Sequence, residues 1–404
     1  MRKKRHLIKP PMKVLYVGNI LPPEVSRALR TSIAGNKFEL SFVKVLDDEL
    51  DGNVDIISVS HSGHSEIKQN NIGEVYAGKH FLHIVPIRKP ILGDVVRDII
   101  FLFLELRWFF RNIKHDKAIL IINSPFGICA LSLLAKLFSA KIVSFTIDTP
   151  FTPSNTFKGF FGWYAKTLFS LGHRILRHFS GIIVLNKAAV ARLQLKIPYL
   201  VTRIGHDDQA YGLDGHERIH AFGAHTPYNI VYAGTLIDYN GVVTLVKAFE
   251  LLDREKYVLH IYGSGPLERV IMEYSNGNSN IVFHGLVDNG EMLEAFSRAD
   301  LLINSRVTSA SVCDFTFPSK MTEYLLSGRP VLTTDFSSLP EEYKRFVYLI
   351  ADETPSGFCR AIEEVFSEEE SRCIERCNDG VKYIRQYQSW KKISKDVYEF
   401  FKSL

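Results

Sequence analysis

Three glycine-containing turns in the second half of the chain have the residue types that bind phosphate groups. Each follows a short apolar run: Gly234 and Thr235 with Gly241, Gly263 to Pro266, and His284 to Leu286. Such turns let backbone N–H groups approach phosphate oxygens at the positive end of a helix. Any tight strand-to-helix turn uses glycine, so each turn alone also fits a purely structural role. Together, at one sheet edge, they indicate a nucleotide site.

In the first half of the chain, polar residues that can handle a proton follow the predicted strands. His61, His64 and Asp148 are the candidates to position an acceptor or take its proton. A histidine at a strand end is also commonly an ordinary polar cap. His61 and His64 have no third ligand nearby in the sequence, and no Cys-x-x-Cys pair is present. We therefore expect no structural or catalytic metal.

Two other nucleotide-binding classes are disfavoured. A nicotinamide dehydrogenase would have Gly-x-Gly-x-x-Gly after its first strand, but Gly18 is followed by Asn19 to Pro23 without a second glycine. Gly263 and Gly265 supply only two of the three glycines, and Pro266 suits a first helical position. No Walker A sequence is present.

Short apolar runs alternate with longer amphipathic stretches, which predicts parallel sheets covered by helices, that is, an α/β doubly wound fold. Expected strands of the first half are Lys13 to Val17, Val54 to Ser60, Phe81 to Val85, Ala118 to Asn123, Lys141 to Ile147 and Gly181 to Leu185. Those of the second are Ile230 to Ala233, Val258 to Tyr262, Ile281 to Phe283, Leu301 to Asn304, Pro330 to Thr333 and Phe346 to Ile350. Ligands bind such sheets at the carboxyl edge of the strands.

The 404 residues exceed the size of one hydrophobic core, so we expect two domains. Residues 206–226, rich in glycine and histidine, are the predicted linker between domains at 1–205 and 227–380. The end of the chain is predicted to be helical, with polar turns near Glu368 and Gly380. We expect helices at 381–404 to pack back on the N-terminal domain.

The charge is unevenly distributed. Residues 1–205 hold 29 Lys and Arg against 14 Asp and Glu, and Thr149 to His206 has eight basic residues and no acid. Aromatic residues are interleaved there between Phe157 and Phe169. A solvated basic face and a surface that docks to the anionic cytoplasmic leaflet both fit. Nucleic acid is disfavoured because no recognition motif accompanies the charge.

The chain has the features of a cytoplasmic protein. Its five cysteines fit a reducing compartment, and the apolar run after the basic Met1 to Pro11 is too short for a signal peptide. The most hydrophobic stretch, Ile99 to Phe110, is interrupted by Glu105 and Arg107, so we expect no membrane span.

The segment Leu301 to Tyr343 is the most specific in the sequence. It contains Asn304 and Arg306, then Phe317 to Lys320, Glu323, and Ser327 to Val331. With the upstream motifs Tyr232 to Thr235, Ile261 to Leu267, Phe283 to Val287 and Ala299 to Ser305, it resembles glycosyltransferase family 4, and especially bacterial capsule and O-antigen enzymes. The resemblance covers about 120 residues and implies the GT-B fold, two facing Rossmann-like domains with a cleft between them.

The resemblance implies a role for each matching residue. Glu323 would accept hydrogen bonds from both ribose hydroxyls of a donor nucleotide, and Ser319 to Thr322 would offer N–H groups to its diphosphate. Gly285 to Val287 would hold the nucleobase, and Gly234 and Thr235 would lie beneath the diphosphate. Gly263 and Gly265 complete the expected donor site. Asp148 resembles the family's acidic turn after its strand.

Two departures from the family pattern matter. Phe315 stands where many members have a second glutamate, and Thr235-Leu236 and Asn240 stand where many have Arg and Lys. Arg306 and Lys320 are our candidates to replace the missing diphosphate charge. The alternative for Arg306 is a surface pair with Asp314.

The resemblance implies transfer of a hexose from a nucleoside diphosphate, UDP by family likeness, to a glycan or polyprenyl-linked acceptor. Retention of anomeric configuration is usual in the family. No cofactor is expected, because the nucleotide sugar is a substrate. Two alternatives remain open: a UDP-sugar epimerase or hydrolase of the same fold, and a non-catalytic partner protein.

Overall fold

The computed structural model describes residues 12–20, 33–59, 74–76, 79–80, 82–84, 90–122, 126–147, 167, 171–172, 174–206, 226–310, 313 and 316–404. The chain forms two compact units. The N-terminal unit comprises Met1–Arg203 with Trp390–Leu404, and the C-terminal unit comprises Ile204–Ser389. Most of the predicted linker, residues 207–225, lies outside the described residues.

The N-terminal unit contains a seven-stranded parallel sheet in the order β5-β2-β1-β6-β7-β8-β9. Its strands are β1 (Lys13–Gly18), β2 (Val54–Val59), β5 (Leu82–Ile84), β6 (Lys117–Ile122), β7 (Lys141–Thr146), β8 (Gly181–Val184) and β9 (Tyr199–Val201). Six of them were predicted; β9 is too short and too exposed to give a sequence signal. Two short strands, β3 (Glu74–Tyr76) and β4 (Lys79–His80), pair separately.

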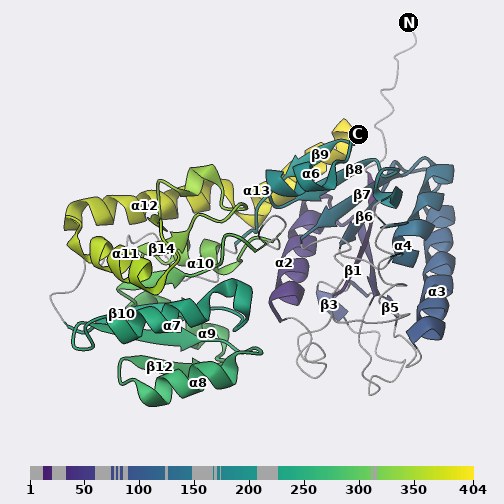
Figure 1. The fold of residues 1–404 in the computed structure, drawn as a ribbon. Coiled ribbons are helices and arrows are strands. Elements are labelled where there is room, and N and C mark those ends of the chain that lie inside the picture. Colours follow the sequence, from purple (N-terminus) through teal and green to yellow (C-terminus); the bar gives the residue numbers. More distant parts are fainter. Residues whose placement is uncertain are drawn as a thin grey trace, which may run out of the picture. The chain divides into compact units, whose positions relative to one another are not determined.

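Helices cover both faces of this sheet, as Figure 1 shows, with α2 (Ile33–Glu49) on one face and α3 (Pro90–Arg111) and α4 (Phe126–Leu131) on the other. The 3-10 helix η1 (Ser132–Phe138) follows α4, and α6 (Lys187–Leu193) follows β8. Asn186 caps α6 by accepting a hydrogen bond from the Ala189 N–H, 2.8 Å away.

The last helix, α13 (Trp390–Ser403), packs against α2. The Trp390 ring lies 5.0 Å from the Phe38 ring, and the Lys141 ammonium donates to the carbonyl of Phe401 at 2.6 Å. The chain therefore leaves the N-terminal unit after Arg203 and returns to it at Trp390.

The C-terminal unit contains a six-stranded parallel sheet in the order β12-β11-β10-β13-β14-β15. Its strands are β10 (Tyr228–Ala233), β11 (Tyr257–Tyr262), β12 (Ile281–Gly285), β13 (Leu301–Asn304), β14 (Val331–Thr334) and β15 (Tyr348–Ile350). All six were predicted.

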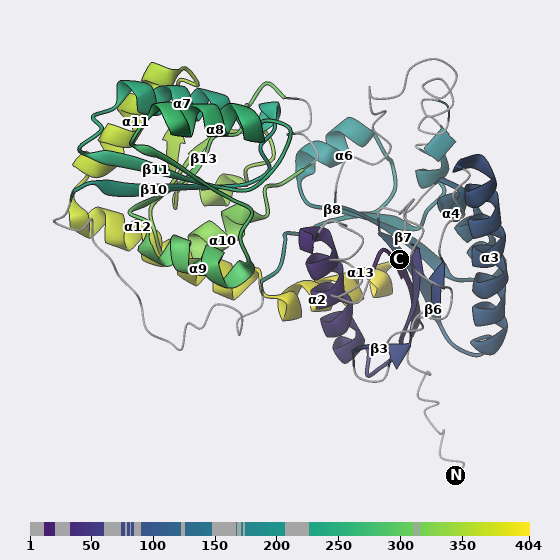
Figure 2. The same cartoon turned by 90° about the horizontal axis from the view of Figure 1, so that it is seen from below.

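Helices lie on both faces of this sheet, as Figure 2 shows. On one face are α7 (Val242–Leu251), α8 (Glu268–Gly277) and α11 (Pro355–Ser367). On the other are α9 (Asn289–Arg298), α10 (Lys320–Leu326) and α12 (Glu370–Tyr387). Continuous apolar strands are buried on both sides by these layers, as parallel sheets require.

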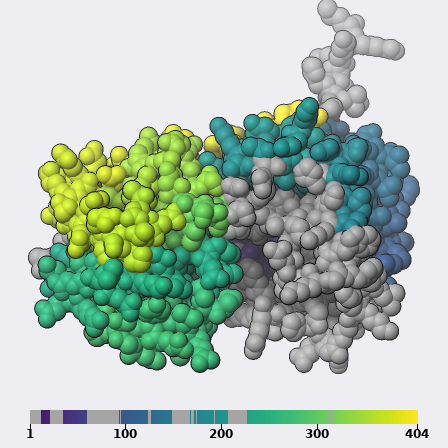
Figure 3. Space-filling model, viewed as in Figure 1, coloured from purple at the N-terminus to yellow at the C-terminus, as the bar shows by residue number. Residues whose placement is uncertain are grey.

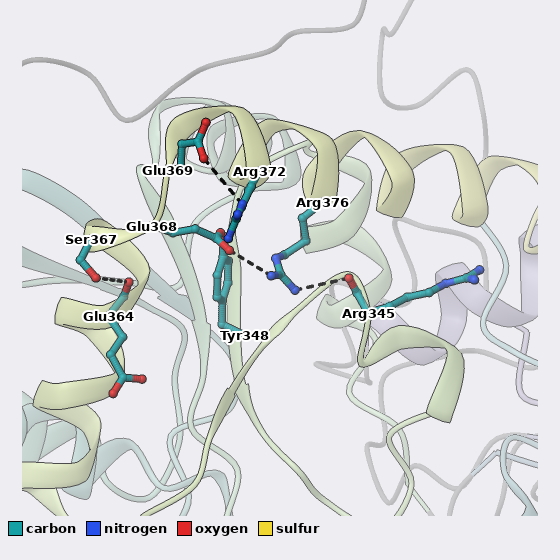
Figure 4. A network of polar contacts seen from close by, with 8 residues as sticks. All are labelled: Arg345, Tyr348, Glu364, Ser367, Glu368, Glu369, Arg372 and Arg376. Carbon is teal, nitrogen blue, oxygen red and sulfur yellow. Dashed lines mark hydrogen bonds and ion pairs between the residues drawn. The ribbon is translucent and has the colours of Figure 1, made fainter.

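The prediction of a turn near Gly380 is wrong, because α12 (Glu370–Tyr387) is continuous through this residue. A Cβ atom at position 380 would lie 3.2 Å from the Leu325 side chain and 3.4 Å from that of Phe346. Glycine here permits close packing of α12 on α10 rather than a bend. Nearer the start of α12, Arg376 donates to Glu368 at 3.1 Å and to the Arg345 carbonyl at 3.4 Å (Figure 4).

Candidate functional site

The three predicted glycine turns meet at the carboxyl edge of the C-terminal sheet. The Gly263 N–H donates to the Gly285 carbonyl at 2.7 Å, and the Leu236 N–H donates to the Ser264 carbonyl at 3.0 Å. The turns after the neighbouring strands β10, β11 and β12 are thus joined by backbone hydrogen bonds. The prediction that they share one edge of one sheet is confirmed.

Glycine is required at two of these positions by close backbone approach. A Cβ at Gly263 would lie 1.9 Å from the Gly234 carbonyl oxygen, and one at Gly265 would lie 2.5 Å from that of Leu236. Gly285 differs, since an added Cβ would meet no atom within 4 Å, and its φ of +69° is the reason that a side chain is disfavoured. The turn continues through the half-buried Val287 to Asp288, which caps α9.

The loop after β10 is also tied to the loop after β13. Asn240 donates its side-chain N–H to the Thr235 carbonyl at 2.7 Å, and the Val307 N–H donates to the Tyr239 carbonyl at 2.9 Å. The Ser305 hydroxyl donates to the Asn240 carbonyl at 2.7 Å. The Asn240 side chain therefore closes the loop, and it presents no charge to a ligand.

Arg306 is buried rather than open to solvent. The residue is 4% exposed, and its guanidinium lies 5.6 Å from the centre of the Tyr239 ring and 5.8 Å from that of Phe336. It donates to the Thr316 hydroxyl, while its Nε has no partner among the described residues. Asp314 and Phe315 lie outside the described residues, so the Arg306 to Asp314 pair stays untested.

Lys320 and Glu323 lie together in the first turn of α10. The Lys320 Nζ is 2.5 Å from the Glu323 Oε2, and their side chains are 31% and 18% exposed. Lys320 also lies over the Phe296 ring, 5.6 Å from its centre. Ser319 precedes the helix without a side-chain capping bond, and the Met321 N–H is already bonded to the Pro318 carbonyl.

Tyr324 connects this helix turn to the glycine turns, a role that the sequence did not reveal. Its buried hydroxyl accepts the Ala233 N–H at 2.9 Å and donates to the Ala233 carbonyl at 3.3 Å. Burial raises the pKa of this phenol, so it stays protonated. Ala233 directly precedes Gly234, and therefore the residues around Glu323 are anchored at the glycine edge.

A histidine pair lies next to the Gly285 turn. The His260 Nδ1 and the His284 Nε2 are 3.0 Å apart, and the His284 ring stacks on Tyr262 at 4.2 Å. Burial lowers the pKa of both histidines, although the Glu291 carboxylate partly opposes this for His284. Both imidazoles are neutral at physiological pH, so they add no positive charge to the site.

The proton-handling candidates of the N-terminal unit, His61, His64 and Asp148, all lie outside the described residues. Most of the basic aromatic stretch from Phe157 to His178 does so too. Among the residues that the structure describes, no group of three or more His, Cys, Asp or Glu could hold a metal ion.

Comparison with known proteins assigns a class to the C-terminal unit. Residues 227–368 match the family described as glycosyl transferases group 1. No curated protein matches this sequence significantly.

Solved structures match both units together. The Anabaena protein Alr3699/HepE in complex with UDP is 12% identical, with a TM-score of 0.66 over 97% of this chain and 100% of that one. Sucrose-phosphate synthase from Thermosynechococcus elongatus is also 12% identical, with a TM-score of 0.68 over 97% and 98%. The lipopolysaccharide outer core galactosyltransferase WaaB is 12% identical, with a TM-score of 0.62 over 96% and 99%.

These likenesses show the fold, which is the GT-B arrangement of two Rossmann-like domains. The family match shows a glycosyltransferase domain at residues 227–368, and the chain is accordingly an enzyme of the glycosyltransferase class.

Proposed function

We propose that this protein transfers a hexose from a UDP-sugar to a glycan or polyprenyl-linked acceptor in the synthesis of a cell-surface polysaccharide, with retention of configuration. The observation that carries the proposal is the set of joined turns at one sheet edge, with the Lys320 and Glu323 pair anchored beside them. Backbone N–H groups suit a diphosphate, and a carboxylate suits two ribose hydroxyls.

Among the described residues, only one of the two carboxylate oxygens of Glu323 forms a hydrogen bond. Its Oε2 is engaged by Lys320, and no hydrogen bond to its Oε1 is found among the described residues. When a ribose binds Glu323, the Lys320 ammonium becomes free to turn toward the diphosphate. Binding of the two ends of the donor is thereby coupled through one ion pair.

UDP is favoured by the structural relatives. HepE has been solved with UDP and with UDP-glucose. A sugar transfer must stabilise the departing diphosphate, and the glycine turns and Lys320 are the groups that supply N–H donors and charge. We assign acceptor binding and removal of the acceptor proton to the N-terminal unit, where Asp148, His61 and His64 remain the candidate residues. No cofactor or metal enters this scheme.

A membrane-facing role is supported by the exposed side of α3. Ile99, Phe103 and Phe110 are 61%, 65% and 66% exposed, and they lie within one stripe of the helix. Figure 3 shows this part of the chain, in blue, at the surface. No described helix is long and apolar enough to span a bilayer.

Basic residues surround that stripe. Arg107 and Arg111 on α3, and Lys114 just after it, are exposed. Lys136 and the 79% exposed Leu137 lie on η1, which contacts α3 through the rings of Phe138 and Phe110. Exposed apolar residues among cations favour the anionic inner face of the cell membrane. These features support the proposal that the enzyme acts in the cytoplasm, peripheral to that surface, with no role in nucleic-acid binding.

The test is donor binding and transfer by Glu323→Gln, which keeps size but replaces a double acceptor by an amide. Affinity for UDP should fall by about 2–3 kcal/mol, because one ribose hydroxyl is then mismatched. The matched control is Glu294→Gln, which also removes a helical ion-pair carboxylate, the one with Arg298, but on α9. Calorimetric titration with UDP measures both variants.

A panel of UDP-sugars with and without an acceptor separates the classes. A transferase releases UDP only when an acceptor is present, whereas an epimerase or hydrolase consumes the donor alone. Normal UDP binding by Glu323→Gln, or no UDP binding by the parent protein, would refute the proposed site.

A further inference from the structure

A buried carboxylate fixes the end of the first strand of the N-terminal sheet. Glu39, on α2, is 7% exposed, and its Oε2 accepts hydrogen bonds from the Tyr16 hydroxyl at 3.0 Å and the Asn19 N–H at 2.8 Å. A Cβ at Gly18 would lie 2.1 Å from this oxygen. Glycine at position 18 therefore leaves room for the carboxylate to reach the backbone where β1 ends.

The same turn is held from a second strand. The buried Ser58 hydroxyl, on β2, donates to the Ile20 carbonyl at 2.6 Å. Residues 18–20 are thus fixed by α2 and β2 at the carboxyl edge of the sheet, which is where parallel sheets bind ligands. A residue held this firmly loses little entropy when it binds a ligand.

Asn19 has an unmet hydrogen-bonding group at this edge. Its side-chain Oδ1 is buried and has no partner among the described residues, although buried polar atoms are nearly always bonded. A hydroxyl group both donates and accepts, so it would satisfy the buried amide atom in either orientation of the amide. A phosphate or carboxylate would fit only the flipped amide, because in the orientation found here it would bring oxygen against the Asn19 Oδ1. The chemistry favours a sugar hydroxyl.

We propose that Asn19 binds a hydroxyl of the acceptor sugar and that Glu39 is the positioning residue that holds Asn19 in place. The proposal rests on the proposed sugar transfer and names a residue of the acceptor side. Glu39 touches no ligand itself in this arrangement, since its bonded oxygen is directed at Tyr16 and the Asn19 backbone.

The charge of Glu39 gives this arrangement a pH dependence. Burial raises the pKa of Glu39 to about 7, and the bonds from Asn19 and Tyr16 oppose the rise. Among the described residues, Tyr16 is the titratable group that contacts Glu39. On α2 beside Glu39, Phe38 and Phe42 contact the Phe145 and Trp390 rings of β7 and α13. Protonation weakens the hold on the Asn19 N–H, so acceptor affinity should fall between pH 8 and pH 6.

The experiment measures sugar binding by saturation-transfer NMR with UDP present to fill the donor site. The probes are the methyl glycosides of glucose, galactose and N-acetylglucosamine. Asn19→Leu removes the amide and should weaken binding roughly 10-fold, the loss expected for one hydrogen bond. Asn53→Leu is the control, because Asn53 precedes β2 at the opposite edge of the same sheet. UDP affinity should change less than about twofold in each.

Glu39→Gln provides the second readout. Its sugar affinity should no longer change between pH 8 and pH 6, an effect that a merely structural role would not produce. If Asn19→Leu does not fold, Asn19→Ala, which only removes atoms, repeats the test.

The possible failures are distinguishable. If the parent protein does not bind UDP, the proposed function is wrong. If UDP binds but no probe sugar does up to about 50 mM, a weak limit for such contacts, the acceptor assignment is overturned. The same holds if Asn19→Leu binds the sugars as the parent does. A parent protein whose sugar affinity is independent of pH refutes the role of Glu39.

Discussion

The two cations expected near the diphosphate differ in how the protein uses them. Lys320 is partly exposed and forms a local pair with Glu323, whereas Arg306 is buried between two rings and bonded to Thr316. A buried guanidinium is part of the packing as well as a charge, and its removal leaves the surrounding polar groups unpaired.

We predict opposite phenotypes for the two methionine variants. Lys320→Met should weaken UDP binding by about 1.5–3 kcal/mol without lowering the melting temperature, because a partly exposed ion pair within one helical turn contributes little to stability. Arg306→Met should lower the melting temperature by several degrees, since it removes a buried cation and the hydrogen bond that this cation donates to the Thr316 hydroxyl. Calorimetric titration with UDP and uridine, together with thermal denaturation, tests this.

Binding of uridine, which lacks the diphosphate, is the control. Both variants should bind uridine as the parent does if the charges act on the diphosphate alone. Equal melting temperatures for the two variants would contradict the structural role of Arg306, and unchanged UDP binding by Lys320→Met would contradict its role at the diphosphate.

At the scale of elements, α3 contains a carboxyl that its surroundings do not stabilise. Glu105 is fully buried, and both of its carboxylate oxygens lack a partner among the described residues. Burial raises the pKa of Glu105 to about 8. Because its ordinary value is 4.5, the folded protein binds a proton more tightly than the unfolded chain between these pH values. Its contribution to stability therefore decreases as the pH rises through that window.

Glu105→Gln should consequently stabilise the protein, and more so at higher pH. The gain should be small near pH 5 and approach an upper bound on the order of 5 kcal/mol above pH 8, from roughly 1.4 kcal/mol for each unit of pKa. Urea denaturation across pH 5 to 9 measures the difference. Glu250→Gln, at an exposed position on α7, should show no such trend. A constant difference between Glu105→Gln and the parent would contradict the assignment.

At the scale of the whole molecule, the chain ends in the unit where it began. Trp390 is 6% exposed and contacts Phe38 and Phe42. Trp390→Ala should cost about 3–5 kcal/mol, the usual loss for a large buried aromatic. Hydrogen exchange should rise in α2 and β7 but not in the C-terminal sheet. Lys391→Ala, exposed on the same helix, is the control. Equal exchange in the two variants would contradict the anchoring role of α13.

Membrane association also belongs to this scale. The double variant Phe103→Ser and Phe110→Ser should reduce sedimentation with anionic liposomes by roughly 10-fold, because exposed apolar area is removed from the interface. Leu251→Ser, an equally exposed apolar site on α7 at 63%, should bind as the parent does. Binding should weaken as salt is added. Equal binding to neutral vesicles, or none to either kind, would refute a role for α3 at the membrane.

The sequence alone determined the features that depend on local pattern. Alternating apolar runs predicted the six strands of the C-terminal sheet, and the glycine turns after three of them predicted which strand ends meet. These signals are readable because strand burial and tight turns restrict residue type at each position.

Only the tertiary structure decided which side chains that are distant in the sequence contact one another. Nothing in the sequence shows that Arg306 is buried between Tyr239 and Phe336, or that Gly380 serves packing rather than a turn. Likewise, Glu39 is an unremarkable helical glutamate until α2 brings its carboxylate to the end of β1. The role of each of these residues depends on how deeply it is buried and on which residues of other elements it contacts. Both are set by contacts between elements that are distant in the sequence, and no local sequence pattern encodes such contacts.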